Sequence, residues 1–275
     1  MTSNIIRCII AATILVFSSC STEPKSESTT HSIVYLDYQD ILVESLPKYK
    51  SLRFIPLETR ADALIGRIDK IVCTPNHYII LDRNKSKSVY LFNKDGSLFK
   101  TISTLGRGPM EYASLSDIGF DPYNLELVIV DSKLRKIIRY DQGGKYIDEE
   151  FFNFRPFNIG FVDKNTYAIK TMSSEAEPYI LTIDHDGSNP LNVHDIAFEF
   201  NIHWTYYFQS GPSGQLYYEN LKDTIWRIDK DKATPLLTLN YDDRGMDESE
   251  FKNLKDMGKR TRSIPSLPKD KAGDI

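Results

Sequence analysis

Cysteine is scarce in this sequence, and its three copies lie too far apart to build a covalent framework. Cys8, Cys20 and Cys73 form no C-x-x-C pair and no Cys/His cluster. A disulfide-stapled scaffold and a cysteine-rich structural zinc site are therefore not expected.

An excess of basic charge is also missing. The 275 residues carry 34 Lys+Arg against 38 Asp+Glu, which gives a net charge of -4. Non-specific nucleic-acid binding depends on a basic surface that contacts phosphates, so nucleic acid is not expected as a partner. Disorder of the whole chain is not expected either, because 41% of the residues are hydrophobic and 12% are aromatic.

The apolar run at the N-terminus is too short to span a bilayer comfortably as a permanent helix. It covers residues 8–17, follows the charge of Arg7 and precedes two serines. A charged residue, an apolar core and small residues in this order indicate an export signal over residues 1–19. Residues 20–32 are mostly polar, which predicts a tether between this signal and the body of the chain.

The end of this signal, Phe17-Ser18-Ser19-Cys20, resembles a bacterial lipobox. In lipoproteins of that kind the cysteine sulfur receives a diacylglycerol, the signal is cut before it and the new amino terminus is acylated. The resemblance implies lipidation at Cys20 and a membrane as partner, since several acyl chains together give stable attachment. Phe17 departs from the usual leucine, and an ordinary signal peptide with a chance cysteine is the alternative.

The third cysteine has no partner under this interpretation. Cys8 leaves with the signal and Cys20 is lipidated, so Cys73 stays alone in an apolar stretch. A lone thiol in such surroundings is expected to pack as a small core hydrophobe.

The body of the chain contains a repeat. "YIILDRNKSKSVYLFNKDGSLFKTI" from Tyr78 and "LVIVDSKLRKIIRYDQGGKYIDEEF" from Leu127 share a strand ending in Asp, a basic turn, a second strand, a turn ending in Gly and a third strand. The turn glycines Gly96 and Gly144 are 48 residues apart, and a weaker third copy ends its turn at Gly187, 43 residues further on. A fourth copy begins at residue 214.

Both the turns and the spacing of these copies indicate one architecture. Asp-Gly and Gly-Gly tolerate the positive φ of tight hairpins, and alternating Val, Ile, Tyr and Phe cover a half-buried sheet. Short antiparallel strands at a period in the forties are typical of propeller blades. We therefore predict an all-β fold, a β-propeller of four-stranded antiparallel blades over residues 33–243. A β-sandwich or barrel with accidental spacing is the alternative.

The two ends of the propeller region carry further signals. "SIVYLDY" and "SLRFIPLET" precede the first clear blade and are expected to act as outer strands that close the ring with the C-terminal blade. Phe251, Leu254 and Met257 recur at helical spacing, so residues 244–275 are expected to form a helical or irregular tail.

The stretch "LGRGPMEY" from Leu105, the following "VIVDSKLRKIIRYDQGGKYI" and the earlier "LRFIPLET" before "ALIGRIDKIV" together resemble one family. It is the six-bladed β-propeller lipoproteins of Bacteroides-type gut bacteria, which are related in architecture to NHL-repeat propellers. The resemblance covers residues 33 to 240 and the lipobox. It implies a six-bladed fold and a place in the bacterial cell envelope, on the periplasmic or surface face of the outer membrane, and it implies little chemistry.

The chain is shorter than a six-bladed propeller of that family requires. Six blades need on the order of 270 residues after the tether, whereas residues 33–275 number 243. We therefore expect four to five blades, and a truncated reading frame that ends within residues 244–275 is one interpretation.

The loop "GRGPMEY" is the most distinctive candidate site. A Gly-x-Gly-x-x-Gly nucleotide loop needs glycine where Glu111 stands, and Pro109 interrupts the helix that it must open. Arg107, Glu111 and Tyr112 are then candidates to bind a ligand at the propeller mouth. The alternative is that they lock neighbouring blades together.

No preformed metal site is visible among the five histidines, because none belongs to an H-x-x-x-H or H-E-x-x-H motif. No cofactor is therefore predicted. Under a competing interpretation, His77 or His203 meets carboxylates from other blades at the propeller axis and binds a divalent metal, as in propeller lyases and lactonases. A G-x-S-x-G elbow and a Walker loop are also missing.

The segment "HWTYYFQS" from His203 supplies the last candidates. Its aromatic residues, with His203 and Trp204 at the start, are expected to stack on a sugar ring or a peptide if they face a groove. Core packing is the alternative, since alternation in a blade strand buries about half of them.

The sequence thus predicts a lipid-anchored envelope propeller that binds a small molecule, a glycan or a protein partner. Loops 105–112 and 203–214 are expected to surround its central funnel. The competing hypotheses are a metal-dependent lyase or hydrolase with an axial site, and a degraded copy without independent function.

Overall fold

The computed structural model describes residues 32–35, 51–172, 179–196, 208–211, 214–218 and 224–240. All of them belong to one compact unit, His31–Ile275. Their regular elements are strands throughout, and no helix in this part of the chain is long and apolar enough to cross a membrane. Cys20 with the predicted signal, almost all of the predicted tether and the predicted tail over 244–275 lie outside these ranges.

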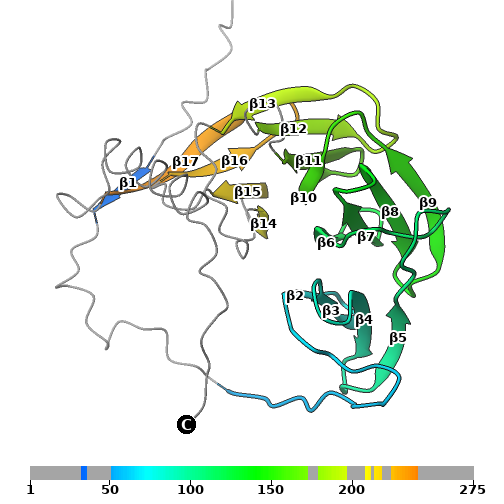
Figure 1. Cartoon of the computed structure of the whole chain (residues 1–275). Coiled ribbons are helices and arrows are strands. Elements are labelled where there is room, and N and C mark those ends of the chain that lie inside the picture. The colour runs from blue at the N-terminus through cyan, green and yellow to red at the C-terminus, as the bar shows by residue number, and fades with distance from the viewer. Residues whose placement is uncertain are drawn as a thin grey trace, which may run out of the picture. The chain divides into compact units, whose positions relative to one another are not determined.

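Sixteen strands form four antiparallel sheets of four strands each, in chain order, which we number blades 1 to 4 (Figure 1). Blade 1 contains β2 (Lys70–Cys73), β3 (His77–Asp82), β4 (Ser88–Asn93) and β5 (Leu98–Ile102). Blade 2 contains β6 (Asp117–Asp121), β7 (Glu126–Asp131), β8 (Lys136–Asp141) and β9 (Tyr146–Phe151). Blade 3 contains β10 (Pro156–Asp163), β11 (Thr166–Thr171), β12 (Tyr179–Asp184) and β13 (Leu191–Asp195). Blade 4 contains β14 (Phe208–Gly211), β15 (Gly214–Tyr218), β16 (Thr224–Ile228) and β17 (Ala233–Asn240).

The repeated turn glycines have the backbone conformation that their sequence motif predicts. Gly96, Gly144 and Gly187 have φ values of 93°, 71° and 79° in the turns between the third and fourth strands of blades 1, 2 and 3. At Gly96 a Cβ atom would also lie 2.0 Å from the carbonyl oxygen of Pro56, so a side chain would collide there as well.

The aspartates that end the second strands tie each blade to the segment leading into it. Asp82 Oδ2 accepts hydrogen bonds from the backbone N–H groups of Gly66 (2.8 Å) and Arg67 (3.0 Å). Asp131 Oδ2 accepts one from the N–H of Ala113 (2.6 Å). The same residue therefore performs the same task in blades 1 and 2, which explains why the repeat contains an aspartate at this position.

Apolar layers between successive blades form the core. One layer joins blades 1 and 2, the next joins blades 2 and 3, and a third joins blades 3 and 4. The first strands of the blades follow one another around a common centre, because β6 contacts β2 and β10, and β10 contacts β14 (Figure 1). This arrangement is a β-propeller, so the predicted fold class is confirmed and the sandwich and barrel alternatives are not.

Two segments were expected to close the ring as outer strands, and one of them forms a strand while the other does not. β1 (Ser32–Tyr35), within "SIVYLDY", pairs in parallel with β17 at the outer edge of blade 4, as predicted. "SLRFIPLET" forms no strand over residues 51–59, so that prediction was wrong. Pro56 has no N–H for a ladder, and the segment instead bonds to the turn before β5 and covers the outer face of blade 1 through Leu57.

Candidate functional site

A cavity of about 550 Å³ lies against the first strands of all four blades. Its apolar wall includes Ile71, Val72, Phe120, Ile159, Phe161 and Phe208. Its polar lining comes from Lys70 and from three residues of blade 4, Gln209, Ser210 and Gln215. The cavity is therefore a mainly apolar hollow with a few hydrogen-bonding groups, built mostly on strands, with Pro75, Pro122 and Leu125 of two turns at its rim.

A buried carboxylate fixes the strands around this cavity. Asp117, at the start of β6, is 1% exposed and binds Lys70 Nζ of β2 through Oδ1 (2.7 Å). Its Oδ2 accepts from Asn158 Nδ2 and from the N–H of Ile159 in β10, both at 3.2 Å. One side chain thus connects three blades, which holds the cavity wall in place without relying on apolar contacts alone.

A similar polar contact connects blades 3 and 4. Gln215 Oε1 accepts a hydrogen bond from the N–H of Phe161 (2.8 Å). The side chain lies so close to β10 that a Cβ atom at Gly160 would be 2.7 Å from Gln215 Cδ. Glycine at this position is therefore part of how the first strands approach one another.

The lone thiol does not lie in the core. Cys73 is exposed at the end of β2 and lines the cavity, so the prediction of a buried cysteine was wrong. The reason is the position of β2, which is the first strand of blade 1 and alternates between exposed and half-buried residues from Lys70 to Cys73.

The "GRGPMEY" loop connects blades 1 and 2. Glu111 Oε2 accepts from the N–H of Gly108 (2.8 Å) within the loop, and Arg107 is exposed to solvent. Tyr112 is fully buried between the two blades, and its hydroxyl donates to the carbonyl of Lys87 (2.7 Å). Burial raises the pKa of Tyr112. Tyr112 has the geometry of the blade-locking alternative, and ligand binding by Arg107 and Glu111 stays a prediction.

The other sequence-derived candidates are His203, Trp204 and His77. His203 and Trp204 lie outside the described residues. His77, at the start of β3, packs its ring against Phe99 with a centroid distance of 4.7 Å. Burial, with a contribution from nearby Lys94, lowers the pKa of His77 and favours its neutral form.

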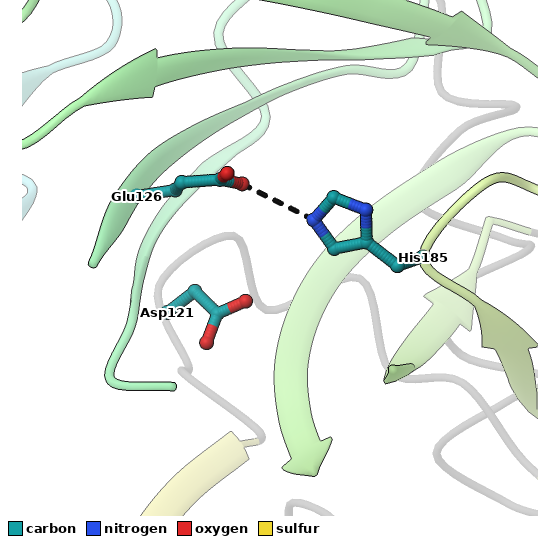
Figure 2. Close-up of side chains that lie close together, drawn as sticks. All are labelled: Asp121, Glu126 and His185. Atoms are coloured by element: carbon teal, nitrogen blue, oxygen red, sulfur yellow. Dashed lines mark hydrogen bonds and ion pairs between the residues drawn. The ribbon is translucent and has the colours of Figure 1, made fainter. Parts of the chain in front are cut away.

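The structure does bring together a set of metal-ligand types that the sequence did not reveal. Figure 2 shows Asp121, Glu126 and His185, whose ligand atoms all lie within 4.8 Å of one another. Asp121 and Glu126 face each other across the β6–β7 hairpin, and His185 follows β12 in the next blade. No local motif connects them, because the histidine is dozens of residues away and meets them only through the packing of blade 3 on blade 2.

The chemistry of this cluster allows two roles. An imidazole and two carboxylates suit a divalent transition metal such as Zn²⁺ or Mn²⁺. Protein groups already use part of this capacity, since Glu126 Oε2 lies 3.2 Å from His185 Nε2. Asp121 also accepts hydrogen bonds from the N–H of Tyr123 (2.8 Å) and from Asn124. The same groups therefore bridge blades 2 and 3 without an ion.

The sequence matches, over residues 35–266, the family described as a domain of unknown function, DUF4934. The chain belongs to the DUF4934 family. No curated protein matches this DUF4934 chain.

Solved structures share the fold of this DUF4934 chain. A protein of Bacteroides fragilis provisionally assigned as exported superposes with a TM-score of 0.62 at 20% identity, over 77% of this chain and 61% of that one. The DUF4934 chain thus spans about three-fifths of that relative's length. A catalytically inactive virginiamycin B lyase from Staphylococcus aureus, crystallised with quinupristin, gives a TM-score of 0.44 at 17% identity, over 60% of this chain and 53% of that one.

Proposed function

We propose that this DUF4934 chain is a cell-envelope propeller, attached to the bacterial outer membrane by a lipid on Cys20, that binds a ligand or a protein partner and does not catalyse a reaction. The observation that carries the proposal is the cavity of about 550 Å³ against the first strands. Small-molecule sites in proteins are typically clefts of roughly 300–1,000 Å³ with apolar walls and a few placed polar groups.

The wall of the cavity suggests the class of ligand. Phe120, Phe161 and Phe208 contribute aromatic surface, while the exposed Gln209 contributes an amide that donates and accepts hydrogen bonds. Aromatic rings beside an amide suit a molecule with apolar ring faces and polar edges. A glycan or a short peptide fits this description, and both are available to a protein of the cell envelope.

The exposed thiol of Cys73 allows a direct test of the cavity. In the full chain with Cys8→Ser and Cys20→Ser, Cys73 is the remaining thiol. A panel of soluble oligosaccharides and short peptides is screened for members that slow the reaction of Cys73 with N-ethylmaleimide. We expect a cavity ligand to protect the thiol, and we expect the alkylated protein to lose that ligand.

The control for this experiment is a variant that lacks the thiol of Cys73. Cys73→Ala removes the alkylation site without adding bulk, so ligand binding should survive treatment with the reagent. A ligand that binds equally well before and after alkylation, without slowing it, would place the binding site elsewhere.

The lipid anchor is tested separately. The lipobox resemblance supports it, and the provisional assignment of the B. fragilis relative as exported agrees with a place in the envelope. When a bacterial host that processes lipoproteins is grown with a labelled fatty acid, we expect the label in the full chain and its loss in Cys20→Ala. A label that persists in the variant would refute the assignment.

The Asp121, Glu126 and His185 cluster is the observation that favours a second candidate, a metal-dependent lyase or hydrolase. The β6–β7 hairpin that holds both carboxylates also lines the cavity through Pro122 and Leu125, so the cluster lies next to the cavity's edge. Measuring Zn²⁺ and Mn²⁺ in purified protein tests this candidate. Stoichiometric metal that is lost in His185→Ala supports it, and equal metal contents in both proteins would end it.

A further inference from the structure

A second cavity, of about 270 Å³, lies between the loops of blades 1 and 2. Its lining comes from the β3–β4 turn (Arg83, Asn84 and Lys87), from the connection into β6 (Leu105 and residues 113–116) and from Phe157 of β10. Because neighbouring strands run in opposite directions, the β3–β4 turn and the connection into β6 share one edge of the propeller. The two cavities have no lining residue in common, so they are separate sites.

The charge of this pocket has one sign. Arg83 and Lys87 line it, and no carboxylate does. The carboxylates nearby are already engaged. Asp69 accepts from the backbone N–H of Arg83 (2.7 Å) and pairs with Arg67 (3.0 Å), and Asp131 accepts from the N–H of Ala113 (2.6 Å).

Within the described part of the chain, the two cationic side chains have no protein acceptor. Among the residues that the structure describes, neither Arg83 nor Lys87 forms an ion pair, and the buried Nε of Arg83 has no hydrogen-bond partner. A guanidinium N–H that is cut off from water and unpaired is costly, and an acceptor in the pocket removes that cost once the Arg83 side chain turns toward it. Solvated surface charge does not account for this atom, because water does not reach it.

The turn that carries both side chains is held in place. Lys87 has a φ of 52°, a conformation unusual for a lysine, and its carbonyl accepts the hydroxyl of Tyr112 at 2.7 Å. On the other side of the turn, the N–H of Lys85 donates to Asp82 Oδ1 (2.9 Å). The backbone that carries the two cationic side chains is therefore held in place before any ligand arrives, which lowers the entropy lost on binding.

We propose that this pocket binds the anionic group of a small ligand, a carboxylate, sulfate or phosphate, through Arg83 and Lys87. All three groups are planar or tetrahedral oxyanions that suit the fork of a guanidinium together with an ammonium. Leu105 and Phe157 supply apolar surface for the body of the same ligand. This site goes beyond the proposed function, because its lining residues are not those of the first cavity and it does not depend on that cavity.

The test compares anions on four versions of the full chain: the native sequence, Arg83→Gln, Lys87→Gln and Lys85→Gln. Lys85 belongs to the same turn, is exposed and does not line the pocket, so its variant matches the others in lost charge. Thermal unfolding is followed while phosphate, sulfate or D-glucuronate replaces chloride at equal ionic strength. Sulfate and phosphate stabilise most proteins by exclusion from the surface, so the comparison between variants carries the result.

We expect the native chain and Lys85→Gln to respond alike, and Arg83→Gln and Lys87→Gln to need at least fivefold more anion for the same rise in melting temperature. A response to glucuronate alone identifies a carboxylate ligand, and a response to phosphate or sulfate identifies a tetrahedral one. Equal responses in all four proteins would overturn the proposal.

A second measurement covers the case in which a variant does not fold. Amide resonances of the native chain are followed by NMR during a phosphate titration and, separately, a glucuronate titration. Saturable shifts that concentrate at residues 83–87 and 113–116 support the pocket. Shifts that are scattered over the surface or absent would overturn it.

Discussion

Lys70 Nζ lies 2.7 Å from Asp117 Oδ1, and this ion pair joins the first strands of blades 1 and 2 where they face the larger cavity. Asp117 also binds Asn158 and the backbone of Ile159 in blade 3. A single carboxylate therefore compensates one cation and two N–H donors from two other blades. Because the Asp117 carboxylate is buried, the loss of any one partner would leave a charge or a hydrogen-bonding group uncompensated.

Asp117→Ala is expected to lower the free energy of unfolding by about 3–5 kcal/mol, because it removes the carboxylate that pairs with the nearly buried ammonium of Lys70 and that accepts two N–H donors of blade 3. Urea unfolding of the full chain measures the loss. Asp62→Ala is the control, since Asp62 pairs with Arg60 while both side chains are largely exposed. A loss for Asp117→Ala no larger than that of the control would contradict the structural role given to the carboxylate.

Local chemistry made much of the fold predictable. The turns at Gly96, Gly144 and Gly187 require a positive φ, which glycine provides at little cost, and the aspartates at 82 and 131 recur because each caps the same backbone groups. These features depend on residues within one blade and its leading segment. They repeat along the chain, so periodicity exposed them.

Contacts between blades were not predictable in the same way. Asp121 and Glu126 lie on one hairpin, but His185 joins them only because the third turn of blade 3 packs beside the first turn of blade 2. Cys73 was misplaced for a related reason, because its apolar neighbours indicate a strand but not that the strand borders a cavity. Sequence spacing carries no information on which loops of neighbouring blades meet.

Gly119→Ala is expected to destabilise the propeller by about 1–3 kcal/mol through overpacking. A Cβ atom at Gly119 would lie 2.7 Å from Phe161 Cε2 and 3.1 Å from Ile159 Cγ2, so β6 and β10 would have to separate. Gly143→Ala is the matched control, because its nearest contact is Asp141 Oδ1 at an ordinary 3.4 Å. Chemical denaturation measures the free energy of unfolding of both variants, and equal stability would show that the packing between blades 2 and 3 accommodates an added methyl group.

His77 is expected to make the protein less stable in mild acid. Burial lowers the pKa of His77 in the folded state, so the unfolded chain binds the proton more readily and stability falls as the pH drops below about 6.5, the ordinary pKa of histidine. His77→Phe keeps an aromatic ring against Phe99 and removes the titration. Urea unfolding at about pH 7.5 and about pH 5.5 should show a smaller acid-induced loss in the variant than in the native chain, and an unchanged loss would assign the pH dependence to other groups.

Tyr112→Phe tests the connection between blades 1 and 2 at the level of one oxygen atom. The hydroxyl donates to the carbonyl of Lys87 at 2.7 Å and lies 3.2 Å from that of Ile102, and the side chain has no exposed surface. Its removal takes this donor away from the carbonyls of Lys87 and Ile102, the second of which is buried, and this costs about 1–3 kcal/mol. Tyr123→Phe is the control, because Tyr123 also donates to a carbonyl, that of Val162, but is 48% exposed and water can replace it.

Since burial raises the pKa of Tyr112, the folded state keeps a proton that the unfolded chain loses above about pH 10, so stability should fall with rising pH there and fall less in Tyr112→Phe. If both variants lost the same stability, and both kept the alkaline slope of the native chain, the hydroxyl would have no part in joining the two blades.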